Sequence, residues 1–109
     1  MSEIVLEVEG EGAVAATEEL LQTPGIAGNW EPATEEPQRD GVLATIATIV
    51  GITVGVVELA EKIYHWYQKR RQQPDPTQRI ERAMLIGRKG QRILLKNATI
   101  EQICRILDE

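Results

Sequence analysis

The sequence is poor in the residues that form cross-links and catalytic centres. Its 109 residues include one cysteine, Cys104, one histidine, His65, and one serine, Ser2. A single cysteine cannot form an intrachain disulfide. The sequence therefore gives no indication of a secreted, disulfide-rich protein and is compatible with a reducing compartment. Without a second histidine or a nearby nucleophile, the Ser-His-Asp and Cys-His arrangements and the usual metal-ligand spacings are not found. We therefore expect a non-enzymatic protein with no catalytic residue, no cofactor and no metal site.

Aromatic residues and positive charge are also scarce. Phenylalanine is absent, and only two tryptophans and two tyrosines occur, so the core must be built from Ile, Leu, Val and Ala. Twelve basic residues against 17 acidic ones give a formal net charge of -5, which disfavours nucleic acid as a partner because phosphate contacts need clustered Lys and Arg. The segment MSEIVLEVEGEG is acidic where a signal peptide would be basic. We expect a cytoplasmic protein.

The longest uncharged stretch, GVLATIATIVGITVGVV from Gly41 to Val57, dominates the middle of the chain. Its bulky and small side chains separate onto two faces when they are placed at 3.6 residues per turn. The same period continues through YHWYQKRRQQ and meets no breaker before Pro74. We therefore predict one hydrophobic to amphipathic helix over residues 41–72, about 48 Å long at 1.5 Å per residue. Because β-branched residues are frequent in the run, a pair of strands broken at Gly51 is the alternative.

The predicted helix has two possible environments. Seventeen uncharged residues lie at the lower limit of the roughly 17 to 25 that span a bilayer. The basic cluster after the aromatic pair Trp66 and Tyr67 is typical of an interfacial anchor on the cytoplasmic side, and consists of Lys69, Arg70 and Arg71. Alternatively, the helix is buried in a small domain, and these cations complement the dipole of its last turn. The membrane alternative predicts an inner-membrane protein whose C-terminal part is in the cytoplasm.

The same helix also predicts self-association. Three small residues four apart form the small-xxx-small pattern that lets two helices approach closely, and several large apolar side chains follow on a helix too long for its own domain to cover. We expect a homo-oligomer with a helix-packing interface made of Ala47, Gly51, Gly55, Ile63, Tyr64, Trp66 and Tyr67. The alternative is that Gly51 and Gly55 only let the helix lie against a sheet.

Regular elements are also predicted on both sides of the central run. Alternation and helical spacing indicate a strand at 3–9, a short helix at 13–22, strands at 80–86 and 92–95, and a closing helix opened by Thr99. Trp30 lies either in a short edge strand at 28–32 or in a loop from which it caps the core. Residues 73–79 form a proline-containing linker. Basic residues in and around the hairpin either bind phosphate or an acidic partner or protect a sheet edge, and are Arg79, Arg82, Arg88, Lys89, Arg92 and Lys96.

Together these elements predict a single α+β domain over residues 1–109. Its small mixed sheet combines the N-terminal strand with the C-terminal β-hairpin, and it carries the long central hydrophobic helix and two short helices. Glycines in GEG at the end of the first strand lack the spacing and the following lysine of a phosphate-binding loop, and two glutamates flank them. We therefore do not expect an anion site there.

The layout as a whole resembles a known family. Strand EIVLEVEGEG, helix AVAATEELLQTPG, a glycine-spaced hydrophobic helix ending in WYQKRR, hairpin AMLIGRKGQRILL and helix IEQICRILDE together resemble the small effector-associated constant component proteins of bacterial conflict systems. The resemblance spans nearly the whole chain and rests on layout. It implies a non-enzymatic adaptor in defence that is encoded with interchangeable effectors such as proteases and with signalling partners.

From these features we predict an adaptor or interaction module that couples an effector protein to its partners, by self-assembly through the central helix. The alternative is a single-pass protein that anchors to or perforates a membrane with residues 41–57.

Overall fold

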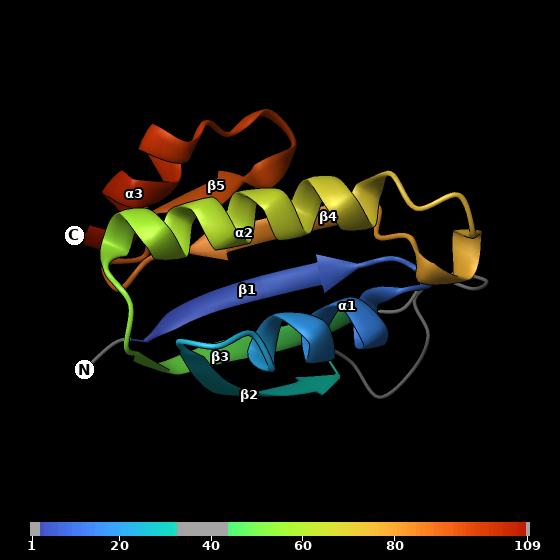
Figure 1. Cartoon of the computed structure of the whole chain (residues 1–109), viewed down its shortest axis with the longest axis horizontal. Helices are drawn as coiled ribbons and strands as arrows, with labels where there is room; N and C mark the ends of the chain where they lie inside the picture. The colour runs from blue at the N-terminus through green and yellow to red at the C-terminus, as the bar shows by residue number, and fades with distance from the viewer. Residues whose placement is uncertain (1–2, 33–43, 109) are drawn as a thin grey trace.

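The computed structural model describes residues 3–32 and 44–108 and places five strands of these residues in one antiparallel sheet (Figure 1). The strand order is β2-β3-β1-β4-β5, so β1 lies at the centre. The strands are β1 (Ile4–Glu9), β2 (Ile26–Pro32), β3 (Ala44–Ile52), β4 (Arg82–Ile86) and β5 (Arg92–Leu94). The α+β class, the N-terminal strand, the C-terminal hairpin and the edge strand that carries Trp30 are therefore confirmed. The predicted mixed sheet is wrong, because every strand pairing is antiparallel.

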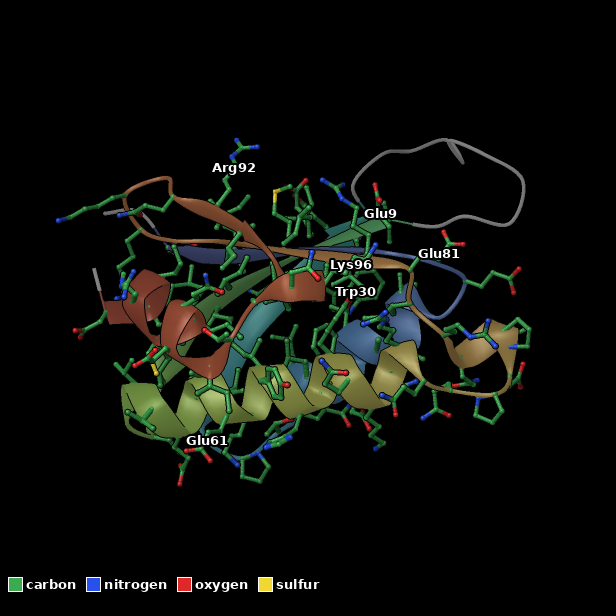
Figure 2. The ribbon with its side chains drawn as sticks, turned by 90° about the horizontal axis from the view of Figure 1, so that it is seen from above. Glu9, Trp30, Glu61, Glu81, Arg92 and Lys96 are labelled. Carbon is green, nitrogen blue, oxygen red and sulfur yellow. The ribbon has the colours of Figure 1, made fainter. Side chains whose placement is uncertain are left out.

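The helices in the described residues are α1 (Ala13–Leu21), α2 (Val56–Arg71) and α3 (Ile100–Asp108), with short 3-10 turns η1 (Pro76–Gln78) and η2 (Leu95–Asn97). All three helices cover the same face of the sheet, as Figure 2 shows from above. Alternate residues of β1 point to that face and are buried there, namely Ile4, Leu6 and Val8. We call this the inner face and the opposite one the outer face.

The connections follow a known arrangement. Since neighbouring strands are antiparallel, β3 and β4 run parallel on either side of β1, and α2 joins them across it. In the same way, α1 joins β1 and β2 on either side of β3. Two such split β-α-β units with the order β4-β1-β3-β2 form a ferredoxin-like sheet, which β5 and α3 extend. A fold of this kind supports many functions and identifies none.

The predicted helix over residues 41–72 is wrong in its first half. Residues 44–52 form β3, the chain turns at residues 53–55, and helix begins only at Val56. Six of the nine residues of β3 are β-branched, and such residues pack well on a pleated sheet and lose rotamer freedom in a helix. Residues 41–43 lie outside the described part of the chain.

The shorter helix removes the overhang that the sequence predicted. Sixteen residues of α2 span about 24 Å at 1.5 Å per residue, which is shorter than the longest dimension of the molecule, 36 Å. Within the described residues, no helix is both long enough and apolar enough to cross a membrane. Residues 44–55, which the membrane alternative placed in a spanning helix, form β3 and a turn instead.

Two buried hydrogen bonds fix the helices on the inner face. The hydroxyl groups of Thr17 in α1 and Thr45 in β3 lie 2.7 Å apart. The indole N–H of Trp66 in α2 donates to the carbonyl oxygen of Ala16 in α1 at 2.8 Å. Because a buried polar group costs free energy unless it is paired, these bonds specify where each helix lies as well as allowing its burial.

Gly12 marks a close approach between the β1-α1 turn and the segment before β4. Its N–H donates to the carbonyl oxygen of Arg79 at 3.0 Å. A Cβ atom at Gly12 would overlap the backbone carbonyl of Gln78. The second glycine of GEG, Gly12, therefore allows two backbone segments to pack closely, and no bound anion is needed to explain its presence.

Replacing Gly12 by alanine tests this contact. We expect Gly12→Ala to lower the free energy of unfolding by about 1 to 3 kcal/mol, the usual cost of forcing extra atoms into a packed site. Gly51→Ala is the matched control, because its Cβ would meet only the Cβ of Ala27 at 3.5 Å, an ordinary contact. Urea denaturation of both variants measures the difference. Equal stability of the two would contradict the close approach at Gly12.

Candidate functional site

The residues predicted to form a ladder of small side chains do not share a helix. Ala47 is buried on the inner face of β3, and Gly51 lies near the end of the same strand. Gly55 precedes α2 as its N-cap residue. The small-xxx-small pattern therefore has no helical surface on which to act.

The large apolar residues of the predicted interface lie on α2, and three of them are covered by the chain itself. Ile63, Trp66 and Tyr67 are buried in the core, and Tyr64 is half-buried against it. The ring of Tyr64 meets that of His65 edge to face, with centroids 5.5 Å apart. The premise that these side chains lack a cover is therefore wrong, and the self-association of the chain stays a prediction that needs another surface.

The basic cluster at the end of α2 ties two helices together. The Glu19 carboxylate of α1 accepts from the Lys69 ammonium at 2.9 Å and from the Arg70 guanidinium at 2.8 Å. Arg70 is buried and also donates to the backbone and side chain of Gln78. Arg71 is exposed in the same last turn, where cations complement the helix dipole. Lys69 and Arg70 are thus engaged within the fold.

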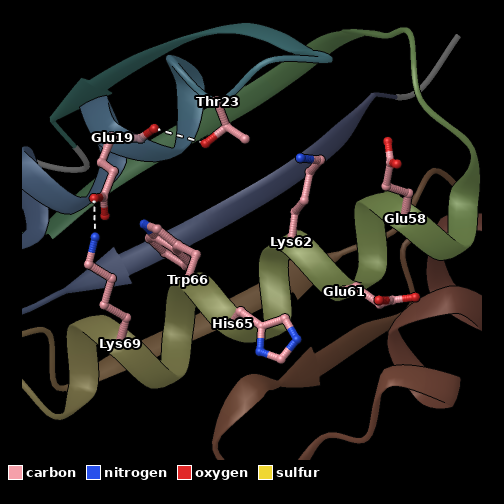
Figure 3. Close-up of a pocket in the computed structure, with 8 residues that line it drawn as sticks. All are labelled: Glu19, Thr23, Glu58, Glu61, Lys62, His65, Trp66 and Lys69. Atoms are coloured by element: carbon pink, nitrogen blue, oxygen red, sulfur yellow. Dashed lines mark hydrogen bonds and ion pairs between the residues drawn. The ribbon is translucent and has the colours of Figure 1, made fainter.

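A groove of about 470 Å³ runs between α1 and α2 (Figure 3). Its lining residues are Glu19, Thr23, Glu58, Glu61, Lys62, His65, Trp66 and Lys69. Lys62 and Trp66 extend toward α1, whereas His65 points away from it. We call this hollow the α1–α2 groove.

The polar side chains that line the α1–α2 groove do not act together. The Thr23 hydroxyl donates to the carbonyl oxygen of Glu19 at 3.1 Å, and His65 is directed elsewhere, so the two do not form a nucleophile and base. Glu19 is already paired with Lys69. Within the described residues, no group of three or more His, Cys, Asp or Glu side chains is placed to hold a metal ion.

The outer face of the sheet, in contrast, carries a group of apolar side chains. The pairings set Val5 beside Ile86 and Met84 beside Leu94. Ile46 lies on the far side of Glu7 from Met84, so the apolar residues of this face on four strands are Val5, Ile46, Met84, Ile86 and Leu94. Val50 extends the patch at a bulge where adjacent β2 residues pair with Ile49 and Gly51. Val50 and Leu94 are 55% and 46% exposed, and a depression of about 250 Å³ lies between Val50, Ile46 and Glu31. The sequence prediction missed this surface, because it requires knowing which strands are neighbours.

Charged side chains divide the outer face into two halves. The acidic half lies on β1 and β2 and carries Glu7, Glu9 and Glu31, whereas the basic half lies on β4 and β5 and carries Arg82 and Arg92. Figure 2 shows Glu9 and Arg92 on the side away from the helices and Trp30 on the helix side. Glu9 and Arg82 approach to 3.4 Å where the halves meet. Two of the six basic residues singled out in the sequence therefore belong to this face.

The ion pairs of Glu19 predict a pH-dependent contribution to stability. Partial burial favours the neutral carboxyl, but hydrogen bonds and charge from Lys69 and Arg70 outweigh it and hold the pKa of Glu19 below its ordinary value of 4.5. A lowered folded-state pKa stabilises the fold above the unfolded pKa, and the contribution is lost as the pH falls through the folded pKa.

We therefore expect Glu19→Gln to lower the free energy of unfolding at neutral pH by about 1 kcal/mol, since solvent screens part of the pairing. The deficit should shrink as the pH falls below 4.5 and through the lowered folded-state pKa of Glu19. Glu18→Gln, at an exposed neighbouring residue, is the control and should show no such deficit. Thermal or urea unfolding across acid pH measures both, and a deficit that persists unchanged at low pH would contradict the ionic origin.

No family model, curated protein or solved structure matches this chain. The resemblance to effector-associated constant component proteins therefore stays a prediction, and the function must be argued from the surfaces of the fold.

Proposed function

We propose that this chain is a non-enzymatic protein-interaction module whose docking surface is the outer face of its sheet. In the setting that the resemblance implies, it is an adaptor that couples an effector protein, such as a protease, to its partners in a bacterial conflict system. The observation that carries the proposal is the apolar patch on the outer face, which none of the described helices covers.

The patch departs from what an open sheet face normally presents. An antiparallel sheet with one solvated face usually alternates apolar and polar side chains, so that its outer positions are polar. Here both faces of β3 are largely apolar, with Ile46 and Val50 outward. Burial of one large apolar side chain is worth roughly 1.5 to 3 kcal/mol. A partner protein that covered several of these side chains would therefore gain free energy by binding to the outer face. Contiguous apolar surface of this kind often marks an interaction site.

The charges on the outer face favour a protein over a nucleic acid. Carboxylates of Glu7, Glu9 and Glu31 stand among or beside the apolar side chains, and they would repel phosphates. The formal net charge of -5 acts in the same direction. A protein surface can match both the acidic and the basic half, because it can present both signs of charge.

A pair of valine substitutions tests the docking surface. Val50→Lys places a charge on the outer face, whereas Val57→Lys makes the same change on α2. Both side chains are exposed, at 55% and 60%, so neither substitution should disturb the core. Isothermal titration calorimetry against the protein encoded beside this chain measures the effect.

We expect Val50→Lys to weaken that binding about tenfold or more, a loss of roughly 1.4 kcal/mol, and Val57→Lys to leave it unchanged. Equal binding by the two variants would show that the outer face is not the docking surface. A larger loss for Val57→Lys would move the surface to α2.

A further inference from the structure

We propose that the outer face binds a second copy of this chain, face to face, about a two-fold axis that runs along the boundary between β1 and β4. This inference rests on the proposed function, because it takes the outer face as a docking surface, and it names a second copy as the occupant that an effector protein would have to displace. The argument is that the outer face is complementary to itself in one orientation.

Two of the three outer-face rows of β1 and β4 set chemically complementary side chains beside each other. Val5 lies beside Ile86, Glu7 beside Met84 and Glu9 beside Arg82. One row is thus apolar, the last row carries opposite charges, and the middle row sets a carboxylate beside a thioether. This order along the strands decides how two such faces fit together.

A two-fold axis lying in the interface and parallel to the strands exchanges left and right but keeps the position along each strand. When the axis follows the boundary of β1 and β4, β1 of one copy lies over β4 of the other. Each side chain then faces the second copy's version of its own cross-strand neighbour. Val5 meets Ile86, and Glu9 meets Arg82, each twice because a two-fold interface repeats every contact.

The next strands outward match in the same orientation. Ile46 on β3 and Leu94 on β5 both lie in the row of Glu7 and Met84. The axis places β3 of one copy over β5 of the other, so that Ile46 faces Leu94. Thr48 faces Arg92 in the row of Val5 and Ile86. Sheets that pack in this aligned manner keep their strands within about 30° of each other, so the match is best near the axis.

Charge excludes the other simple orientation. An in-plane axis perpendicular to the strands would place β1 over β1 in the reverse direction, so that at least one of Glu7 and Glu9 would face a carboxylate of the second β1 wherever the axis crosses between Val5 and Glu9. With the axis along the strands, Glu9 and Arg82 of both copies form a ring of four alternating charges. Arg82 is 45% exposed and lies 3.4 Å from its own Glu9, so its guanidinium has room for a second carboxylate. Glu7 lies one row from the Arg82 of the second copy.

Two charge-reversal variants test this arrangement, because they predict that binding is restored in a mixture as well as lost in each variant alone. Arg82→Glu makes all four charges of the ring negative, and Glu9→Arg makes all four positive. Each variant alone should therefore dimerise at least about tenfold more weakly than the wild type, since like charges in contact oppose association. A mixture of the two restores both unlike pairs and should form a heterodimer. The double variant Glu9→Arg with Arg82→Glu should form a homodimer again.

Sedimentation velocity at low ionic strength measures the homodimers, and native mass spectrometry of the mixture identifies the heterodimer by mass. Circular dichroism of each variant checks that the sheet is intact, and the mixture itself shows that both variants remain competent to bind. A monomeric wild type would overturn the proposal. So would a mixture that gives no more heterodimer than the variants give homodimers.

The two proposals fail in distinguishable ways. If the wild type is monomeric but Val50→Lys weakens binding to the neighbouring gene's product, the second copy is the wrong occupant and the docking surface stands. If the mixed variants form the heterodimer while Val50→Lys and Val57→Lys bind that product equally, the dimer stands and the outer face is not where the effector docks.

Discussion

The structure depends on the position of β1 between β3 and β4. This one strand pairs on both edges with segments that lie far away in sequence, and its register with each is continuous over five or six residues. Because β3 and β4 are held on opposite sides of β1, α2 must cross over β1 to join them, and it thereby covers the inner face. The buried bond from Trp66 to Ala16 and the ion pairs of Glu19 then hold α1 against α2. Placement of the helices follows from the pairing of the central strand.

Much of the local structure could be predicted from the sequence, because local rules decide it. Strict alternation in residues 3–9 predicts β1, and the turn after Ile86 predicts the hairpin. The predicted start of the closing helix at Thr99 is also confirmed by a capping box, in which Thr99 and Gln102 exchange bonds of 2.9 and 3.1 Å between side chain and backbone. The same local rules did not predict β3, and the reason is physical. It lies between two other strands and is apolar on both faces, so alternation is absent and its pattern fits a helix equally well. Its six β-branched residues were the remaining signal.

The candidate site could not be predicted in the same way, because its residues meet only through tertiary pairing. Arg82 was recognised as one of several basic residues near a hairpin, but nothing local places it beside Glu9. Likewise, Lys69 and Arg70 have the pattern of a membrane anchor when α2 is interpreted as the end of a longer helix, whereas in the fold both form ion pairs with Glu19. The chemistry of a charged side chain in this protein is set by the strand or helix opposite it.

One property of β3 connects the failed prediction with the proposed function. A strand that is apolar on both sides is ambiguous in sequence, and once it is folded it leaves apolar surface on the open side of the sheet. Such a surface would associate with many partners if it were uniformly apolar, and antiparallel sheets with open faces are exposed to that hazard. In the proposed docking surface, Glu7 would limit such non-specific association, because it lies between Ile46 and Met84 in the middle of the patch. Covering the patch with a purely apolar surface would bury its carboxylate without a partner, at a cost that opposes binding. A surface that brings a cation near Glu7 and Glu9 avoids that cost, so in the proposed interaction the carboxylates would select among partners while the apolar side chains would supply the affinity.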